Sequence, residues 1–111
     1  RAPAPPAMHA LVALQHADGT WALTSELAAA IGCDLQRLER ELDGATGSRE
    51  DVRKAWATAL ALAWLRAHAR DAEEEWRLLA AKARRWLDDV EAVPPGRGAW
   101  VDAAAEFLGT R

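Results

Sequence analysis

The chain has 111 residues, of which 50% are hydrophobic and 28% charged, and its formal net charge is −3. This length supports one hydrophobic core and excludes a pair of ordinary-sized domains. The charge balance lacks the positive excess that binding to a phosphate backbone needs, so nucleic acid is not expected as a partner. Alanine (27 residues) and leucine (14) far outnumber the 11 β-branched residues. This composition favours helices over sheets.

The first predicted helix covers residues 7–16. Residues 1–6 contain three prolines and are expected to form an extended linker, so that the chain is a module of a longer protein with one helical domain over residues 7–111. Proline suits the entry to a helix, and apolar residues then follow at helical spacing. Asp18 and Gly19 are predicted to end this helix in a turn.

Two more short helices are predicted over residues 25–31 and 35–42. Thr24 is placed to cap the start of the first, and Gly32 supplies the left-handed residue that commonly follows a helix. Asp34 is predicted to cap the second.

Two long helices and a last short helix complete the pattern. Apolar residues at helical spacing run from 52 to 67 behind a Ser48 cap, and from 76 to 90 behind a capping box that begins at Asp71. A proline- and glycine-rich turn precedes an amphipathic stretch over residues 100–108. The predicted fold is therefore all-α, a compact bundle of about six helices, two long and four short, centred on an antiparallel helical hairpin.

The six tryptophans divide into core and surface candidates. Four of them flank the facing sides of the two long helices and are predicted to fill the contact between them: Trp56, Trp64, Trp76 and Trp86. Trp100 follows the proline- and glycine-rich turn and is predicted to be partly exposed. With Arg84, Arg85 and Arg97 as neighbouring cations it forms a candidate partner-binding site, because Trp and Arg are enriched at interface hot spots.

A second candidate set is structural and consists of Gln15, Asp18, Gly19 and Trp21. These residues are predicted to fasten the turn after the first helix, with Asp18 accepting backbone N–H bonds and Trp21 folding over the helix end. Their pattern, Gln-x-x-Asp-Gly-x-Trp, resembles the glutamine–tryptophan repeat of terpene cyclases and related helical barrels. Those proteins carry several copies and an Asp-rich acid motif that this sequence lacks, so a cyclase-type enzyme fragment is the weakest alternative.

No residue pattern predicts catalysis, a cofactor or a metal site. His9 and His16 lie two helical turns apart, roughly 10 Å along the axis, which is too far for a shared metal ion. Cys33 has no histidine near it in sequence, and a single cysteine fits a reducing compartment. The nearly apolar stretch 55–65 is far below the roughly 20 residues that span a membrane. We therefore expect a cytoplasmic, non-catalytic protein without a small-molecule substrate or a membrane partner.

Four blocks of sequence carry a family resemblance: residues 11–27, 56–65, 75–87 and the Trp-x-Asp-Ala-Ala that begins at Trp100. In order and spacing they resemble the C-terminal domain of proteins that combine a VIT domain with a von Willebrand factor A domain. They are also similar to the major-vault-protein-interaction region of the vault poly(ADP-ribose) polymerase. The resemblance implies a helical, non-catalytic module that binds a protein partner, for example a vault-like shell protein. A structural domain that packs on its own parent chain is the main alternative.

Overall fold

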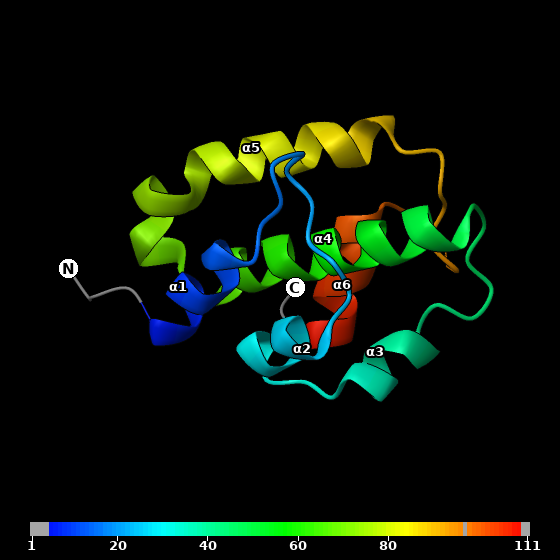
Figure 1. The fold of residues 1–111 in the computed structure, drawn as a ribbon, viewed down its shortest axis with the longest axis horizontal. Coiled ribbons are helices and arrows are strands. Elements are labelled where there is room, and N and C mark those ends of the chain that lie inside the picture. The colour runs from blue at the N-terminus through cyan, green and yellow to red at the C-terminus, as the bar shows by residue number, and fades with distance from the viewer. Residues whose placement is uncertain (1–4, 97, 110–111) are drawn as a thin grey trace.

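The protein is described by a computed structural model that covers residues 5–96 and 98–109. The described residues form six α-helices and one 3₁₀ turn: α1 (Pro6–Ala13), α2 (Ser25–Ile31), α3 (Leu35–Arg40), α4 (Arg49–His68), η1 (Arg70–Ala72), α5 (Glu73–Asp89) and α6 (Trp100–Leu108) (Figure 1). Within these ranges the only β-type pairing is a single antiparallel bridge between Thr46 and Val93. The prediction of an all-α bundle with two long and four short helices is confirmed.

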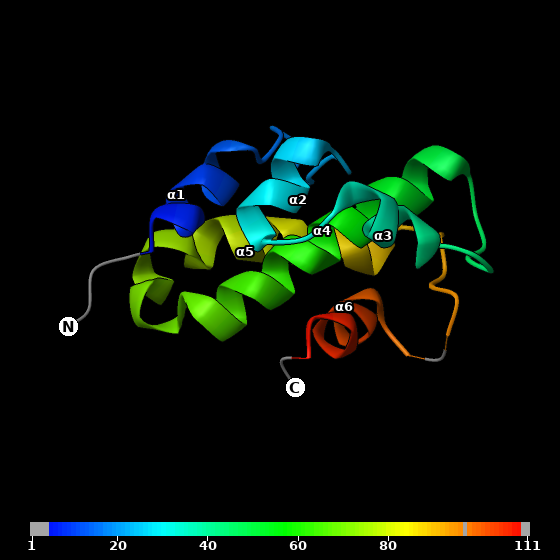
Figure 2. The same ribbon diagram turned by 90° about the horizontal axis from the view of Figure 1, so that it is seen from below.

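Helix α4 lies at the centre of the molecule. Helices α1, α2 and α3 cover one of its faces, α6 lies on the opposite face, and α5 runs alongside (Figures 1 and 2). Every side chain from Ala55 to Leu65 is buried. A helix that is apolar on all sides has to be covered on all sides, which explains the arrangement. Helix α6 packs more extensively on α4 than α5 does. The centre of the bundle therefore consists of the hairpin of α4 and α5 together with α6.

Three predicted helix ends have the expected geometry. The Thr24 hydroxyl accepts a hydrogen bond from the Leu27 N–H (3.2 Å), and Gly32 ends α2 with φ at +76°. The Ser48 hydroxyl likewise accepts from the Asp51 N–H (3.1 Å) at the start of α4. These caps satisfy backbone groups that a helix end would otherwise leave unpaired.

Other predicted ends are wrong. Helix α1 stops at Ala13 because the His16 N–H turns away to the Thr20 carbonyl (2.8 Å). Asp71 lies within the η1 turn, and α5 begins at Glu73 without a side-chain cap. Asp34 is at the N-cap position of α3, but its side chain makes no capping bond. Helix α3 ends at residue 40, two residues early, in a run of turns.

Trp56 does not lie in the predicted contact between the two long helices. Trp56 faces α3 and α6: its indole N–H donates to the Leu38 carbonyl (2.9 Å), and its ring lies against Phe107 (5.6 Å between centroids). The prediction that Trp56 fills the contact with α5 is therefore wrong. Trp76 of α5 links the two long helices, because its indole N–H donates to the carbonyl of Ala69, the residue that follows α4 (2.8 Å).

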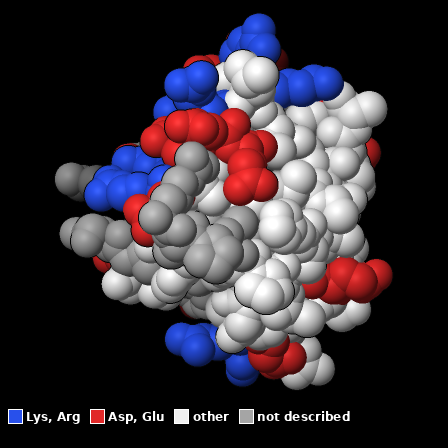
Figure 3. Space-filling view, turned by 90° about the vertical axis from the view of Figure 1, so that its left-hand side faces the viewer, with Lys and Arg blue, Asp and Glu red and all other residues white. Residues whose placement is uncertain are grey.

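One part of the surface lacks charged side chains. The described residues 5–17, which contain all of α1, include no Lys, Arg, Asp or Glu. Figure 3 views the end of the molecule where α1 begins, and it shows a broad area without charged groups beside an area where they gather. No helix in the described ranges combines the length and apolar character needed to cross a membrane.

Candidate functional site

The turn after α1 is held by the residues predicted to fasten it. One carboxylate oxygen of Asp18 accepts hydrogen bonds from the Thr20 backbone N–H (3.0 Å) and the Thr20 hydroxyl (2.6 Å). The Gln15 side-chain amide donates to the Gly19 carbonyl (3.0 Å) and to the Leu79 carbonyl of α5 (3.1 Å). We call Gln15, Asp18, Gly19 and Trp21 the turn clasp, which joins the turn both to itself and to α5.

Trp21 connects the turn clasp to two further helices. Its side chain is fully buried, and its indole N–H donates to the Leu11 carbonyl in α1 (2.8 Å). Its backbone N–H donates to the Thr58 hydroxyl in α4 (3.1 Å). Sequence reasoning missed Thr58, although it is the one hydroxyl in the apolar run 55–65 and a buried hydroxyl needs a partner.

Gly19 allows the turn to lie directly on α5. It has φ at +94°, and a Cβ atom there would be 3.1 Å from the backbone carbonyl carbon of Lys82. Both the backbone conformation and the close approach favour glycine at this position.

Hydrogen bonding lowers the pKa of the Asp18 carboxyl group. The Thr20 hydroxyl bond is the main cause, opposed by partial burial, and the Thr20 backbone N–H and the Lys54 ammonium group (3.5 Å away) add to it. A depressed pKa means that the ionised form is favoured in the folded state.

Asp18→Asn is expected to destabilise the chain at neutral pH and to lose this effect in acid. The stability contributed by ionised Asp18 is fully present above its ordinary pKa, near 3.8, and is lost as the pH falls through the lower folded-state value. Urea unfolding of both proteins from neutral pH down to strongly acidic pH checks this. A stability difference that stays constant across that range would contradict the role of the charge.

Two of the predicted partner-binding residues, Trp100 and Arg84, line a cleft of about 520 Å³. It is formed by the end of α5, the start of α6 and the described residues 90–96 and 98–99 between them, which we call the connecting segment. Its apolar and charged lining residues include Leu87, Val93, Pro94, Trp100, Arg66, Arg84, Asp88 and Asp102. We call it the α5–α6 cleft. Val93 is 49% exposed, and among the described residues only Leu78 is another large hydrophobic side chain with high exposure.

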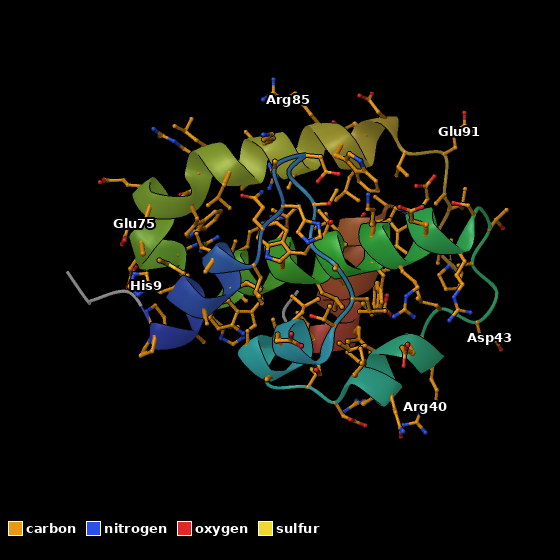
Figure 4. All side chains as sticks on the ribbon, in the orientation of Figure 1. His9, Arg40, Asp43, Glu75, Arg85 and Glu91 are labelled. Carbon is orange, nitrogen blue, oxygen red and sulfur yellow. The ribbon has the colours of Figure 1, made fainter. Side chains whose placement is uncertain are left out.

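The structure separates the four predicted partner-binding residues. Trp100 is only 5% exposed, so the prediction of partial exposure is wrong. Its indole N–H donates to the Ala92 carbonyl (2.9 Å), which draws the ring under the connecting segment and against α4. Arg84 lines the α5–α6 cleft with Trp100, whereas Arg85 points away from the body of the molecule (Figure 4). Arg97 lies outside the described residues.

The connecting segment is held against the loop before α4 by backbone contacts at Ala92 and Val93. The Val93 N–H donates to the Thr46 carbonyl (2.8 Å), and the Val93 carbonyl accepts from the Thr46 N–H (3.0 Å). A Cβ atom at Gly47 would be 2.9 Å from the Ala92 Cα, so the two loops touch through their backbones. Val93 is therefore exposed on a backbone that is already ordered, which reduces the entropy lost on binding.

Cys33 has the properties of an inert thiol. It is half-buried, and burial is the main cause that raises its pKa, with the Arg37 charge opposing. A raised pKa disfavours the thiolate, which is the nucleophilic form. The described residues also contain no group of three His, Cys, Asp or Glu side chains placed to hold a metal ion.

These features define a small helical unit with its own core and an open cleft at the end of α5. The chain is homologous to a region of von Willebrand factor A domain-containing proteins. It is 39% identical over 79 residues to von Willebrand factor A domain-containing protein 5A of Rattus norvegicus, and this match covers 71% of the chain. The human 5A protein is 35% identical over 77 residues, and human protein 5B1 is 41% identical over 70 residues.

The matched region is a small part of those relatives. The chain spans about 9% of the length of the rat and human 5A proteins and 6% of human 5B1. No family model and no solved structure matches the chain. The predicted resemblance to von Willebrand factor A domain proteins is thus confirmed, and the resemblance to the vault enzyme stays a prediction.

Proposed function

We propose that this chain is a non-catalytic module that binds a protein partner through the α5–α6 cleft. The observation that carries the proposal is Val93, a half-exposed apolar side chain on a backbone fixed by two hydrogen bonds to Thr46. Buried Trp100 supports the cleft from below, and Arg66 and Arg84 lie at its rim. An apolar centre with a charged rim is the usual anatomy of a protein interface.

The resemblance of the sequence blocks to the vault-interaction region makes a vault-like shell protein the first partner to test. Such a role needs neither a cofactor nor a small-molecule substrate, and we place it in the cytoplasm. The inert environment of Cys33 supports a binding role over nucleophilic catalysis.

Cross-linking in the full-length protein tests the proposal. A photo-reactive amino acid at position 93 is expected to form a cross-link to another polypeptide, while the same group at position 78, on exposed Leu78, is the matched control. Val93→Arg is expected to weaken partner binding at least about 30-fold, as for a hot-spot residue. Thermal unfolding should change little because Val93 is half-exposed. Equal cross-linking from both positions, or undiminished binding by Val93→Arg, would contradict the proposal.

A second candidate function is packing against other parts of the same parent chain. The surface of α1 without charged side chains favours it, because protein surfaces facing water usually carry many charges (Figure 3). Slower hydrogen exchange of the α1 amides in the parent protein than in the isolated chain would support this function. Cross-links from position 93 that stay within one polypeptide would favour it over partner binding.

A further inference from the structure

We propose that the segment bound in the α5–α6 cleft is acidic, and that its carboxylates bind a cluster of three arginines beside the cleft. This inference rests on the proposed function and names the chemistry of the partner. The three residues are Arg66 and Arg70, at the end of α4 and in η1, and Arg84 of α5, and we call them the arginine cluster.

The arginine cluster surrounds a second, smaller cleft. This cleft has a volume of about 260 Å³ and is lined by the three arginines together with Glu73 and Trp76. Arg66 and Arg84 also line the α5–α6 cleft, so the two clefts share a wall. A bound segment with its apolar side chain on Val93 can therefore reach the arginine cluster with its neighbouring residues.

Within the described part of the chain, the three side chains of the arginine cluster form no ion pair. All three side chains are exposed, and no carboxylate of the described residues lies within the 4 Å of an ion pair, whereas Arg53 binds Glu39 at 2.7 Å. Arginine stays protonated in proteins, so three positive charges line the smaller cleft together with one acidic residue, Glu73. A carboxylate can bind a guanidinium group through two parallel hydrogen bonds, which suits this arrangement.

The acidic residues of the α5–α6 cleft orient the partner. Asp88 and Asp102 line the α5–α6 cleft but not the smaller one, and Asp102 also lines a further cleft with Arg66 and Arg70. These two aspartates disfavour carboxylates within the α5–α6 cleft, so the acidic part of the bound segment is expected at the smaller cleft, which is lined by the three arginines and Glu73. A polyphosphate chain or an anionic membrane would face the same two aspartates without supplying an apolar side chain for Val93. A short protein segment that combines an apolar residue with Asp or Glu fits both clefts.

Selection from a library of short random peptides tests this inference directly. The wild-type chain is expected to enrich peptides in which Asp or Glu neighbours a large apolar residue. Changing those acidic residues to Gln or Asn in the peptide should weaken binding about tenfold. The triple variant Arg66→Gln, Arg70→Gln, Arg84→Gln should weaken it to a similar extent, since exposed ion pairs are individually weak. Arg85→Gln, which removes the same charge from the outer side of α5, should have no effect (Figure 4).

The tryptophan indole N–H signals in NMR spectra show where a selected peptide binds. Adding a selected peptide is expected to shift the signals of Trp76 and Trp100, which line the two clefts, and to leave that of Trp21, which lines neither. The same spectra show whether the triple variant is folded, so that a loss of binding is not mistaken for unfolding.

The outcomes separate this inference from the proposed function. Peptides that bind in a Val93-dependent way without a preference for acidic residues would overturn the inference and leave the proposed function standing. Absence of any Val93-dependent peptide would count against both. Tighter binding of the arginine cluster to phosphatidylserine vesicles than to any peptide, with no binding to phosphatidylcholine vesicles, would overturn the inference in favour of an anionic membrane.

Discussion

Trp21→Ala is expected to lower the free energy of unfolding by about 3–5 kcal/mol, as for other buried Trp to Ala changes. The side chain is fully buried in the core between α1 and α4, so its removal leaves a cavity and takes away one of the two hydrogen bonds that the Leu11 carbonyl accepts. Domains of this size are commonly stable by only about 5–15 kcal/mol. The change is therefore a large share of the total free energy of unfolding. Urea unfolding followed by circular dichroism measures it.

Two companion variants separate packing from hydrogen bonding. Trp21→Phe keeps a large ring but removes the indole N–H, and the loss of this hydrogen bond should account for about 0.5–1.5 kcal/mol, because the Leu11 carbonyl keeps its bond from the Leu14 N–H. Trp86→Ala removes the same side chain from a half-buried position on α5 and should have the smaller effect. If Trp86→Ala were the more destabilising of the two alanine variants, the turn clasp would not be central to the fold.

Local signals allowed part of this structure to be predicted. Thr24 and Ser48 cap helices through bonds to residues three positions ahead, and Gly32 takes a conformation that favours glycine. The contacts of Asp18 and Trp21 likewise join residues close in sequence, at separations of two and ten. Such short-range geometry depends on few degrees of freedom, so residue type and spacing are enough to predict it.

Contacts between helices distant in sequence could not be predicted in the same way. The apolar run in α4 shows that it is buried, but the pattern is apolar on every side and does not indicate which helix covers which side. Trp56 could therefore be assigned to α5, although its ring meets Phe107 of α6. The arginine cluster was missed for a related reason: whether Arg66 and Arg84 find carboxylates depends on the tertiary arrangement and not on spacing along one helix.

Trp100→Ala is expected to destabilise the chain by about 3–5 kcal/mol and to loosen α6 from α4. Trp100 is buried, its indole N–H donates to the Ala92 carbonyl, and its ring lies 6.4 Å from that of Trp56. The alanine variant removes the contact that holds the connecting segment over the start of α6. Faster hydrogen exchange in α6 and in residues 92–93, together with a lower melting temperature, would show this.

Loss of partner binding in Trp100→Ala does not by itself show that the indole contacts the partner. Because Trp100 supports the α5–α6 cleft from within, loss of partner binding in Trp100→Ala would follow from a distorted cleft even if the indole never touched the partner. Val93→Arg alters the exposed side of the same cleft and leaves the Trp100 bond to Ala92 in place. A partner that binds at this cleft should be lost in both variants, with a large fall in melting temperature only in Trp100→Ala. An unchanged melting temperature in Trp100→Ala would mean that the indole is exposed in solution and would contradict its place in the core.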